Sequence, residues 1–363
     1  MEKRPSVTVS QIFVMLFISR MVISMTYGTL LIGNCDIWDH IISAPIAFLL
    51  TFLLTYPIYK LFKMDIRMNL IDNIRGLTGK LSILLISIYI IYYLIVSFHT
   101  LAIFNNFIIN AVDPPMSIPL LSILLLSSAC YGAYKGIEAL ARTSNFILMA
   151  TILSIIFFSI SLSSSIEPIN FEPLFYNGYN SVIEGVFYML SQSACIPALA
   201  VLFPMAEGNH KLGIFFWNTS VYIVFSIFII FITGTMGEFA TTQLFPVYTA
   251  AGIGKFGSFR HLDSLYLAIW MSGIFLKLSL FLLLAGEGIK KILGERARKI
   301  SIIIFSAVMS AFPFFYENFQ ILREEFFTKL LFWYLILISI IIPTFVIVLK
   351  KVKPKKEKIR IEN

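Results

Sequence analysis

The sequence consists largely of uninterrupted apolar blocks of about 20 residues, and this feature limits the chain to a narrow set of folds. A helix of that length crosses the hydrocarbon core of a bilayer, which is ~30 Å thick. Inside lipid the protein must hydrogen-bond its own backbone, so apolar blocks of this length form helices. The short alternating segments of barrel strands do not occur in the sequence. We therefore expect an all-α integral membrane protein.

Composition supports a membrane protein and argues against two other classes. The chain has 363 residues, of which 58% are hydrophobic and 13% charged, and its mean hydropathy is +0.86. A soluble domain is about half apolar and a quarter charged. The net charge of +8 does not indicate a nucleic-acid partner, because most of the positive charge lies between the apolar blocks and at the C-terminus. The three cysteines, Cys35, Cys130 and Cys195, form neither a metal-binding spacing nor a disulfide framework.

The apolar blocks divide the chain into a transmembrane part and a tail. Residues 1–350 form a predicted domain of about ten spans, and residues 351–363 form a basic cytoplasmic tail. The first block is too long for a signal peptide and lacks a small-residue cleavage site, so we expect it to remain as a span. The predicted spans are 11–32, 41–62, 81–110, 117–134, 140–162, 182–203, 212–235, 262–285, 299–316 and 330–349.

Lysine and arginine are distributed very unequally between the two sides of these spans. With the N-terminus inside, 22 of the 28 lie in cytoplasmic connections or the tail, two lie within spans, and four lie outside. Cytoplasmic connections carry an excess of basic residues, so both termini are predicted to be cytoplasmic. The tail is expected to contact anionic membrane lipids. The four outer basic residues are Lys255, Arg260, Arg323 and Lys329.

Two spans carry polar and small residues near their middle. The first contains Ser19–Gly28, and the sixth contains Ser191–Pro197, where proline removes a backbone donor. In a five-plus-five inverted repeat, spans 1 and 6 are equivalent, and paired interruptions indicate a midplane binding site. Close helix packing is the alternative explanation for such residues. The predicted ligand-binding residues, with Arg20, are Ser24, Met25, Thr26, Tyr27, Ser191, Gln192, Ser193 and Ala194.

Three ionisable side chains lie at membrane depth, where charge is expensive and often functional. Arg20 is a candidate partner for a substrate carboxylate, the alternative being a side chain that extends to the interface. Lys277 is a candidate fixed cation in place of a bound ion, or half of an interhelical pair. His99 is a candidate proton relay or a hydrogen-bonded packing group. Glu138 and Arg142 are four residues apart, which predicts a helical ion pair at the cytoplasmic surface.

Several short motifs, in this order and spacing, resemble those of the B subunit of spore germinant receptors, the endospore germination permease family. The resemblance extends over nearly the whole chain. The matching motifs are Ser10-Gln11, Gly136-Ile137-Glu138-Ala139-Leu140-Ala141-Arg142, Glu172-Pro173-Leu174 leading to Gly178, Leu202-Phe203-Pro204, Leu262-Asp263-Ser264 leading to Trp270, and Lys277-Leu278-Ser279.

The resemblance implies a fold, a location and partners. The family belongs to the amino acid–polyamine–organocation superfamily, which has the LeuT-type fold. By this resemblance the chain would lie in the spore inner membrane and bind a small germinant, for which an amino acid is the expected class. It would act with an A-type multispanning membrane subunit and a C-type lipoprotein. No enzymatic activity or cofactor is expected, because the sequence has no nucleotide loop, metal cluster or activated nucleophile.

Two other functions remain open at this point. The chain could be a proton-coupled amino-acid transporter, with His99 or Lys277 in the coupling. It could also be a structural receptor subunit with a degenerate pocket, because three regions depart from the family pattern. Those regions are Val22-Ile23-Ser24 at the glycine-rich break, Ile196-Pro197-Ala198 at the Gly-x-Glu of span six, and Arg260-His261 before span eight.

Overall fold

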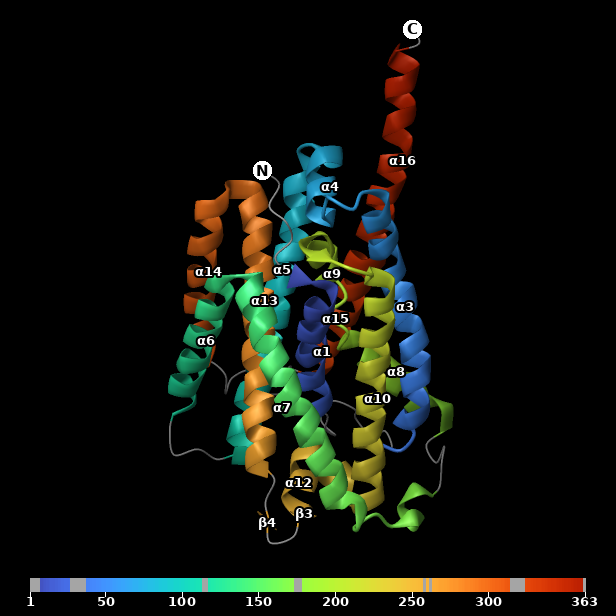
Figure 1. Cartoon of the computed structure of the whole chain (residues 1–363), viewed down its shortest axis with the longest axis vertical. Helices are drawn as coiled ribbons and strands as arrows, with labels where there is room; N and C mark the ends of the chain where they lie inside the picture. The colour runs from blue at the N-terminus through green and yellow to red at the C-terminus, as the bar shows by residue number, and fades with distance from the viewer. Residues whose placement is uncertain are drawn as a thin grey trace.

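We analysed a computed structural model of the chain, which describes residues 7–26, 37–112, 117–172, 178–256, 259–260, 263–313 and 324–361. Long helices run side by side and make up nearly all of the described chain (Figure 1). In its first half the elements are β1 (Val7–Thr8), α1 (Val9–Met25), α3 (His40–Met64), α4 (Leu70–Thr78), α5 (Leu81–Phe107), η1 (Ile108–Val112), α6 (Ile118–Lys135), α7 (Ile137–Ser163) and η2 (Pro168–Phe171).

The second half continues the bundle and adds short elements between its long helices. These elements are α8 (Gly178–Ser191), α9 (Leu199–Leu202), η3 (Phe203–Met205), β2 (Ala206–Glu207), α10 (His210–Met236), α11 (Phe239–Thr242), α12 (Pro246–Ile253), β3 (Lys255–Phe256), β4 (Phe259–Arg260), α13 (Asp263–Leu293), α14 (Glu295–Ser310), α15 (Glu324–Ile336), η5 (Leu337–Ile341) and α16 (Ile342–Ile361).

Seven helices within the described residues are long and apolar enough to cross a membrane. They are His40–Met64, Leu81–Val112, Ile118–Lys135, Ile137–Ser163, His210–Met236, Asp263–Leu293 and Lys329–Val352. The chain is thus an all-α, multi-pass membrane protein, as the apolar blocks predict. The other predicted spans, 11–32, 182–203 and 299–316, fall on α1, α8–α9 and α14. These have 17, 14 plus 4, and 16 helical residues, so the count of ten stays a prediction.

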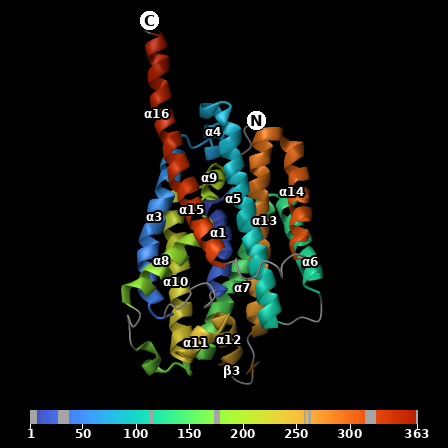
Figure 2. The same ribbon diagram turned by 180° about the vertical axis from the view of Figure 1, so that it is seen from behind.

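The start of α1 is directed towards the end of the bundle that carries α4, and α16 projects beyond that same end (Figures 1 and 2). The opposite end carries α11, α12 and the β3–β4 hairpin, all in the connection between α10 and α13. The ends of the chain therefore share one side, as the charge distribution predicts. α16 continues to Ile361, through most of the predicted tail, and the division of the chain at residue 350 stays a prediction.

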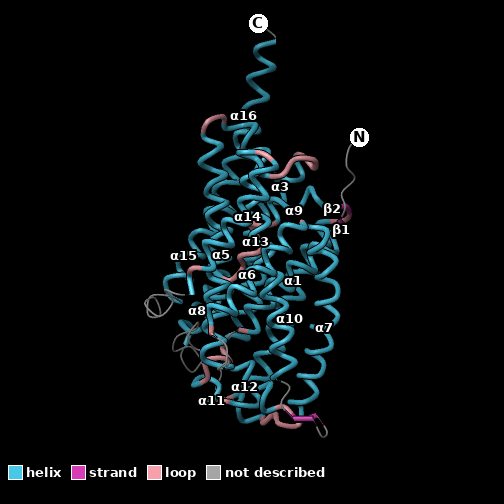
Figure 3. The backbone as a smooth tube through the Cα atoms, turned by 90° about the vertical axis from the view of Figure 1, so that its left-hand side faces the viewer, coloured by secondary structure: helices cyan, strands magenta, loops and turns pink. Residues whose placement is uncertain are grey.

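α1 lies at the centre of the bundle, against α7, α10 and α13. Its residues from Met15 to Met25 are all buried, polar ones included. Thr8 and Gln11 form a capping box at its N-terminus, which satisfies two otherwise unpaired backbone donors. β1 pairs in parallel with β2, so the entry to α1 is joined to the chain that leaves α9 (Figure 3).

Ion pairs lie near the start of α7 and at the junction of α13 and α14. Arg142 Nη2 lies 2.5 Å from Glu138 Oε1, which confirms the helical ion pair predicted from their spacing. At the junction of α13 and α14, Glu295 accepts hydrogen bonds from Lys290 and Arg298. The hydrogen bond from Lys290 lowers the pKa of the Glu295 carboxyl.

Candidate functional site

The chain leaves the α-helix between α8 and α9, from Gln192 to Ala198. Two serine hydroxyls turn back onto carbonyls of the preceding turn: Ser191 Oγ donates to Tyr188 O at 2.7 Å, and Ser193 Oγ donates to Met189 O at 3.0 Å. Such hydroxyls compete with the helical pattern, and Pro197 has no N–H to continue it. The chain here makes tight turns, with Ile196 N donating to Ser193 O at 3.0 Å. This non-helical segment is buried in the bundle.

Tyrosines on α5 hold this segment in place. Tyr93 donates its hydroxyl to Pro197 O at 3.0 Å, and Tyr92 donates to Ala194 O at 3.5 Å. Both rings are fully buried. Neither tyrosine is among the site residues predicted from the sequence. Their spacing could have revealed them, because Tyr89, Tyr92 and Tyr93 follow the i, i+3, i+4 pattern that places side chains on one helical face.

Arg20 reaches from α1 to the end of α8. Its side chain is 7% exposed, and Nη2 donates to Met189 O at 2.5 Å. Nη1 is buried with no hydrogen-bond partner among the described residues, and the same holds for Nε2 of Gln192. Both residues, with Ser24, line one small cavity closed by Tyr188 and by residues of α10. Two unsatisfied N–H donors at a common cavity favour a group that accepts hydrogen bonds.

The cavity has a volume of about 10 Å³. That is the least space in which a single water fits. An amino acid therefore requires α1, α8 or α10 to move before it can enter.

A second buried cation lies close to this cavity. Lys277 on α13 is 2% exposed and makes no hydrogen bond or ion pair within the described chain. It is near enough to Arg20, Cys195 and His99 for electrostatic interaction. His99 on α5 is also buried. Neither cation has a carboxylate partner in the described part of the chain, so the site carries an excess of positive charge and favours an anionic group.

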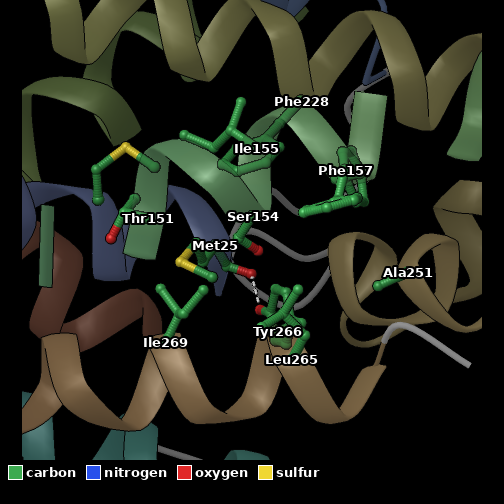
Figure 4. Close-up of a pocket in the computed structure, with 12 residues that line it drawn as sticks. Met25, Thr151, Ser154, Ile155, Phe157, Phe228, Ala251, Leu265, Tyr266 and Ile269 are labelled. Carbon is green, nitrogen blue, oxygen red and sulfur yellow. Dashed lines mark hydrogen bonds between the residues drawn. The ribbon is translucent and has the colours of Figure 1, made fainter. Parts of the chain in front are cut away.

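Met25 and Thr26, which follow Ser24, do not line this cavity. Thr26 accepts a hydrogen bond from Trp270 Nε1 at 2.9 Å, and Met25 O accepts one from the Tyr266 hydroxyl. Figure 4 shows Met25 and Tyr266 at a separate apolar cavity of about 20 Å³ between α1, α7, α12 and α13. The structure therefore joins Arg20, Ser24 and Gln192 but not Met25 or Thr26. Tyr27 lies outside the described residues.

The described residues contain no group of three or more His, Cys, Asp or Glu side chains that could hold a metal ion. The polar groups that line the cavity are instead the guanidinium of Arg20, the amide of Gln192 and hydroxyls. Groups of this kind can bind an anion through charge and hydrogen bonds.

The proteins that are similar to this chain include a curated protein and a solved transporter structure. Spore germination protein KB of Bacillus subtilis (strain 168) is 25% identical over 305 residues, which cover 81% of this chain and 80% of that protein. A Na+-coupled sialic acid symporter, solved in a substrate-bound outward-open state, superposes with a TM-score of 0.64. The superposition covers 92% of this chain and 77% of the symporter, at 12% identity. At this identity the similarity to the symporter supports a transporter-like fold for this chain and nothing about its ligand.

The family described as "Spore germination protein" matches residues 6–321, which include α1, the segment between α8 and α9, and α13. The match spans the elements that carry Arg20, Gln192 and Lys277. The chain therefore belongs to the spore germination protein family.

Proposed function

We propose that this protein is a germinant-sensing membrane subunit of a spore germination receptor, and that it binds an amino acid in a transporter-like midplane pocket. The family and the similarity to Spore germination protein KB support the receptor role. We place the ligand between α1 and the non-helical segment that follows α8. The paired interruption of spans 1 and 6 in a five-plus-five repeat remains part of this proposal.

The buried guanidinium of Arg20 is the observation that carries the proposal. One of its terminal nitrogens is bonded to Met189 O, and the other has no partner at the cavity that Gln192 also lines. A carboxylate accepts hydrogen bonds from both donors, and Lys277 adds a second positive charge. Ser191, Ser193 and Ala194 make hydrogen bonds that hold the non-helical segment beside this cavity, and their contact with the ligand stays part of the proposal.

Sensing requires that the ligand bind one conformation better than another. The closed cavity supplies the weakly binding state, because it has room for one water at most. In the binding state α1 would separate from α8 and α10 and expose Arg20. The displaced helices would transmit the signal to an A-type membrane subunit and a C-type lipoprotein in the spore inner membrane.

An Arg20→Gln substitution tests the proposal. Spores carrying it should need a higher germinant concentration for half-maximal germination, by about tenfold or more, as expected for loss of a charged hydrogen bond of about 1.5–3 kcal/mol. Arg142→Gln is the matched control, because Arg142 is 71% exposed and pairs only at the surface. An unchanged dose–response for Arg20→Gln, with normal protein abundance, would show that the ligand does not contact this side chain. It would favour a structural subunit with a degenerate pocket.

A second candidate function is proton-coupled amino-acid transport. Lys277 favours it, because it is an ionisable side chain buried inside a predicted membrane span, and such residues mark ion and proton pathways. Proteoliposomes separate the two functions. Amino-acid uptake that depends on a pH gradient would support transport, whereas binding without uptake would support sensing. Lys277→Met should abolish uptake if the lysine carries the coupled proton.

A further inference from the structure

A large groove lies on the flank of the bundle, between the first half of α1 and helices α7 and α10. Its volume is about 720 Å³, which is within the range of small-molecule sites. It is separate from the cavity at Arg20. Its rim is exposed: Phe216 is 62%, Ile223 54% and Ile152 48% exposed. In a membrane protein such an apolar rim faces lipid.

The polar residues of the groove are concentrated at one end. Thr8, Ser10, Glu207 and Asn209 line it where β1 and β2 pair and where α1 and α10 begin. That end lies on the side of the two chain termini, which the charge distribution assigns to the cytoplasm. The rest of the lining is mainly aromatic and aliphatic and includes Phe13, Val14, Phe17, Leu148, Ile152, Ile155, Phe216, Ile223 and Val224. This change from a polar to an apolar lining matches an amphiphilic molecule in the cytoplasmic leaflet.

Trp217 supplies an unused donor in the lining. Its side chain is 5% exposed, and its Nε1 has no hydrogen-bond partner in the described chain. It lies seven residues after the start of α10, or roughly 10 Å along the helix from the polar end. Tryptophan is favoured at this interfacial depth. A buried indole N–H usually has an acceptor, and that of Trp217 has none among the described residues of the protein.

The nature of the missing acceptor decides between a lipid and a partner helix. The carbonyls of a transmembrane helix already accept hydrogen bonds within that helix. The ester carbonyls of a glycerophospholipid have free lone pairs at interfacial depth. Among the described residues of the lining, Glu207 is the charged one, and its carboxylate complements an ammonium headgroup.

We propose that this groove binds one glycerophospholipid of the cytoplasmic leaflet. An acyl chain lies against Phe13, Phe17 and Val224, and an ester carbonyl accepts the Trp217 hydrogen bond. The headgroup lies beside Asn209 and Glu207, which favours ethanolamine over glycerol. Because the groove includes residues of β1 and β2, the lipid bridges the strands that join α1 to the segment after α9. The proposal does not depend on the ligand site at Arg20.

Native mass spectrometry of the purified full chain tests this proposal. The protein is incubated with equimolar phosphatidylethanolamine and phosphatidylglycerol of identical acyl chains. We expect one tightly held lipid, with ethanolamine favoured at least threefold. Ser220→Phe, which fills the groove, should reduce the adduct at least tenfold, and Trp217→Phe at least threefold. Ser128→Phe on α6 and Trp333→Phe on α15 are matched controls, because these exposed residues lie outside the lining.

Photocrosslinking of the unsubstituted chain provides an independent measurement if Ser220→Phe does not fold. A phosphatidylethanolamine with a diazirine in its acyl chain should label peptides of α1, α7 and α10 above those of α3 and α6. Equal labelling of all exposed helices, or an adduct that Ser220→Phe leaves unchanged, would overturn the proposed site. The bound lipid would then be ordinary annular lipid. Preferential retention of phosphatidylglycerol would overturn the headgroup assignment. A co-purifying transmembrane protein that crosslinks at Trp217 would replace the lipid with a partner helix.

Discussion

Trp270 donates its indole N–H to the hydroxyl of Thr26, and this bond, 2.9 Å long, fixes the end of α1 to α13. The same hydroxyl donates to Val22 O on its own helix. Tyr266, one turn before Trp270, donates to Met25 O. Two side chains of α13 therefore hold the last turn of α1, next to the closed cavity at Arg20.

A double-mutant cycle measures the strength of this attachment. Trp270→Phe and Thr26→Val should each lower stability, and their coupling free energy should be about 0.6 kcal/mol and at most ~1.7 kcal/mol, as for other hydrogen bonds between membrane helices. Denaturant unfolding of the purified protein is the measurement. The control is the same cycle with Thr143→Val in place of Thr26→Val, because the Thr143 hydroxyl donates to Ala139 O of its own helix. Coupling indistinguishable from that control would mean that the contact does not hold α1.

Lys277→Met should leave the protein as stable as the parent or more stable. Lys277 has no hydrogen bond or ion pair in the described chain, and removing an unpaired buried charge removes its desolvation penalty. Germination should nevertheless require more germinant, because the site loses positive charge. Melting of purified protein and spore dose–response are measured together. A lower melting temperature with unchanged germinant sensitivity would make Lys277 a structural cation instead.

Gly185→Ala should weaken the contact between α8 and α3. A Cβ at Gly185 would lie 2.5 Å from Ser43 Oγ and 2.6 Å from His40 Cδ2, so these side chains or the two helices must shift. Overpacking of this kind costs about 1–3 kcal/mol. Gly76→Ala in α4 is the control, because no atom lies within 4 Å of its added Cβ, and the change should stabilise the helix by about 0.5–1 kcal/mol. Equal effects of the two substitutions on the melting temperature would contradict the close packing.

The orientation of the chain can be tested with introduced cysteines. Thr241→Cys in α11 and Lys356→Cys in the tail are compared in intact cells, after replacement of Cys35, Cys130 and Cys195. A membrane-impermeant maleimide should label position 241 at once and position 356 only after the membrane is permeabilised. Labelling of position 356 in sealed cells would reverse the topology.

The junction of α13 and α14 should respond to acid. The hydrogen bond from Lys290 lowers the pKa of Glu295, so the carboxylate stabilises the folded state above the pKa of an unfolded glutamate, about 4.3. That stabilisation is lost as the pH falls through the lower folded value. Melting temperatures of the parent and of Glu295→Gln should therefore differ at pH 7 and converge near pH 3. A difference that persists at pH 3 would exclude this ionisation as the cause.

The sequence predicts the long helices well, because apolar length is a local property. The span predicted at 41–62 is His40–Met64, and the span at 212–235 is His210–Met236. It also identifies Arg20 and Gln192, since polar residues in apolar blocks stand out. It could not predict that Thr26 would face Trp270 while Ser24 faces Gln192, because the rotation of α1 is set by neighbours far away in sequence. The acceptor for Arg20 is the backbone carbonyl of Met189, and no residue type in the sequence indicates a backbone acceptor.

The pairing of Arg20 with Met189 also has a consequence for how the protein is made. The two residues are 169 positions apart, so at roughly 5–20 residues per second the ribosome needs about 8–34 s to supply the acceptor after the donor. During that interval α1 would carry an unpaired guanidinium, which costs about 2.5–3.5 kcal/mol at the centre of a bilayer. Biogenesis must therefore keep the first helix at the translocon or near the interface until the second half of the chain is inserted.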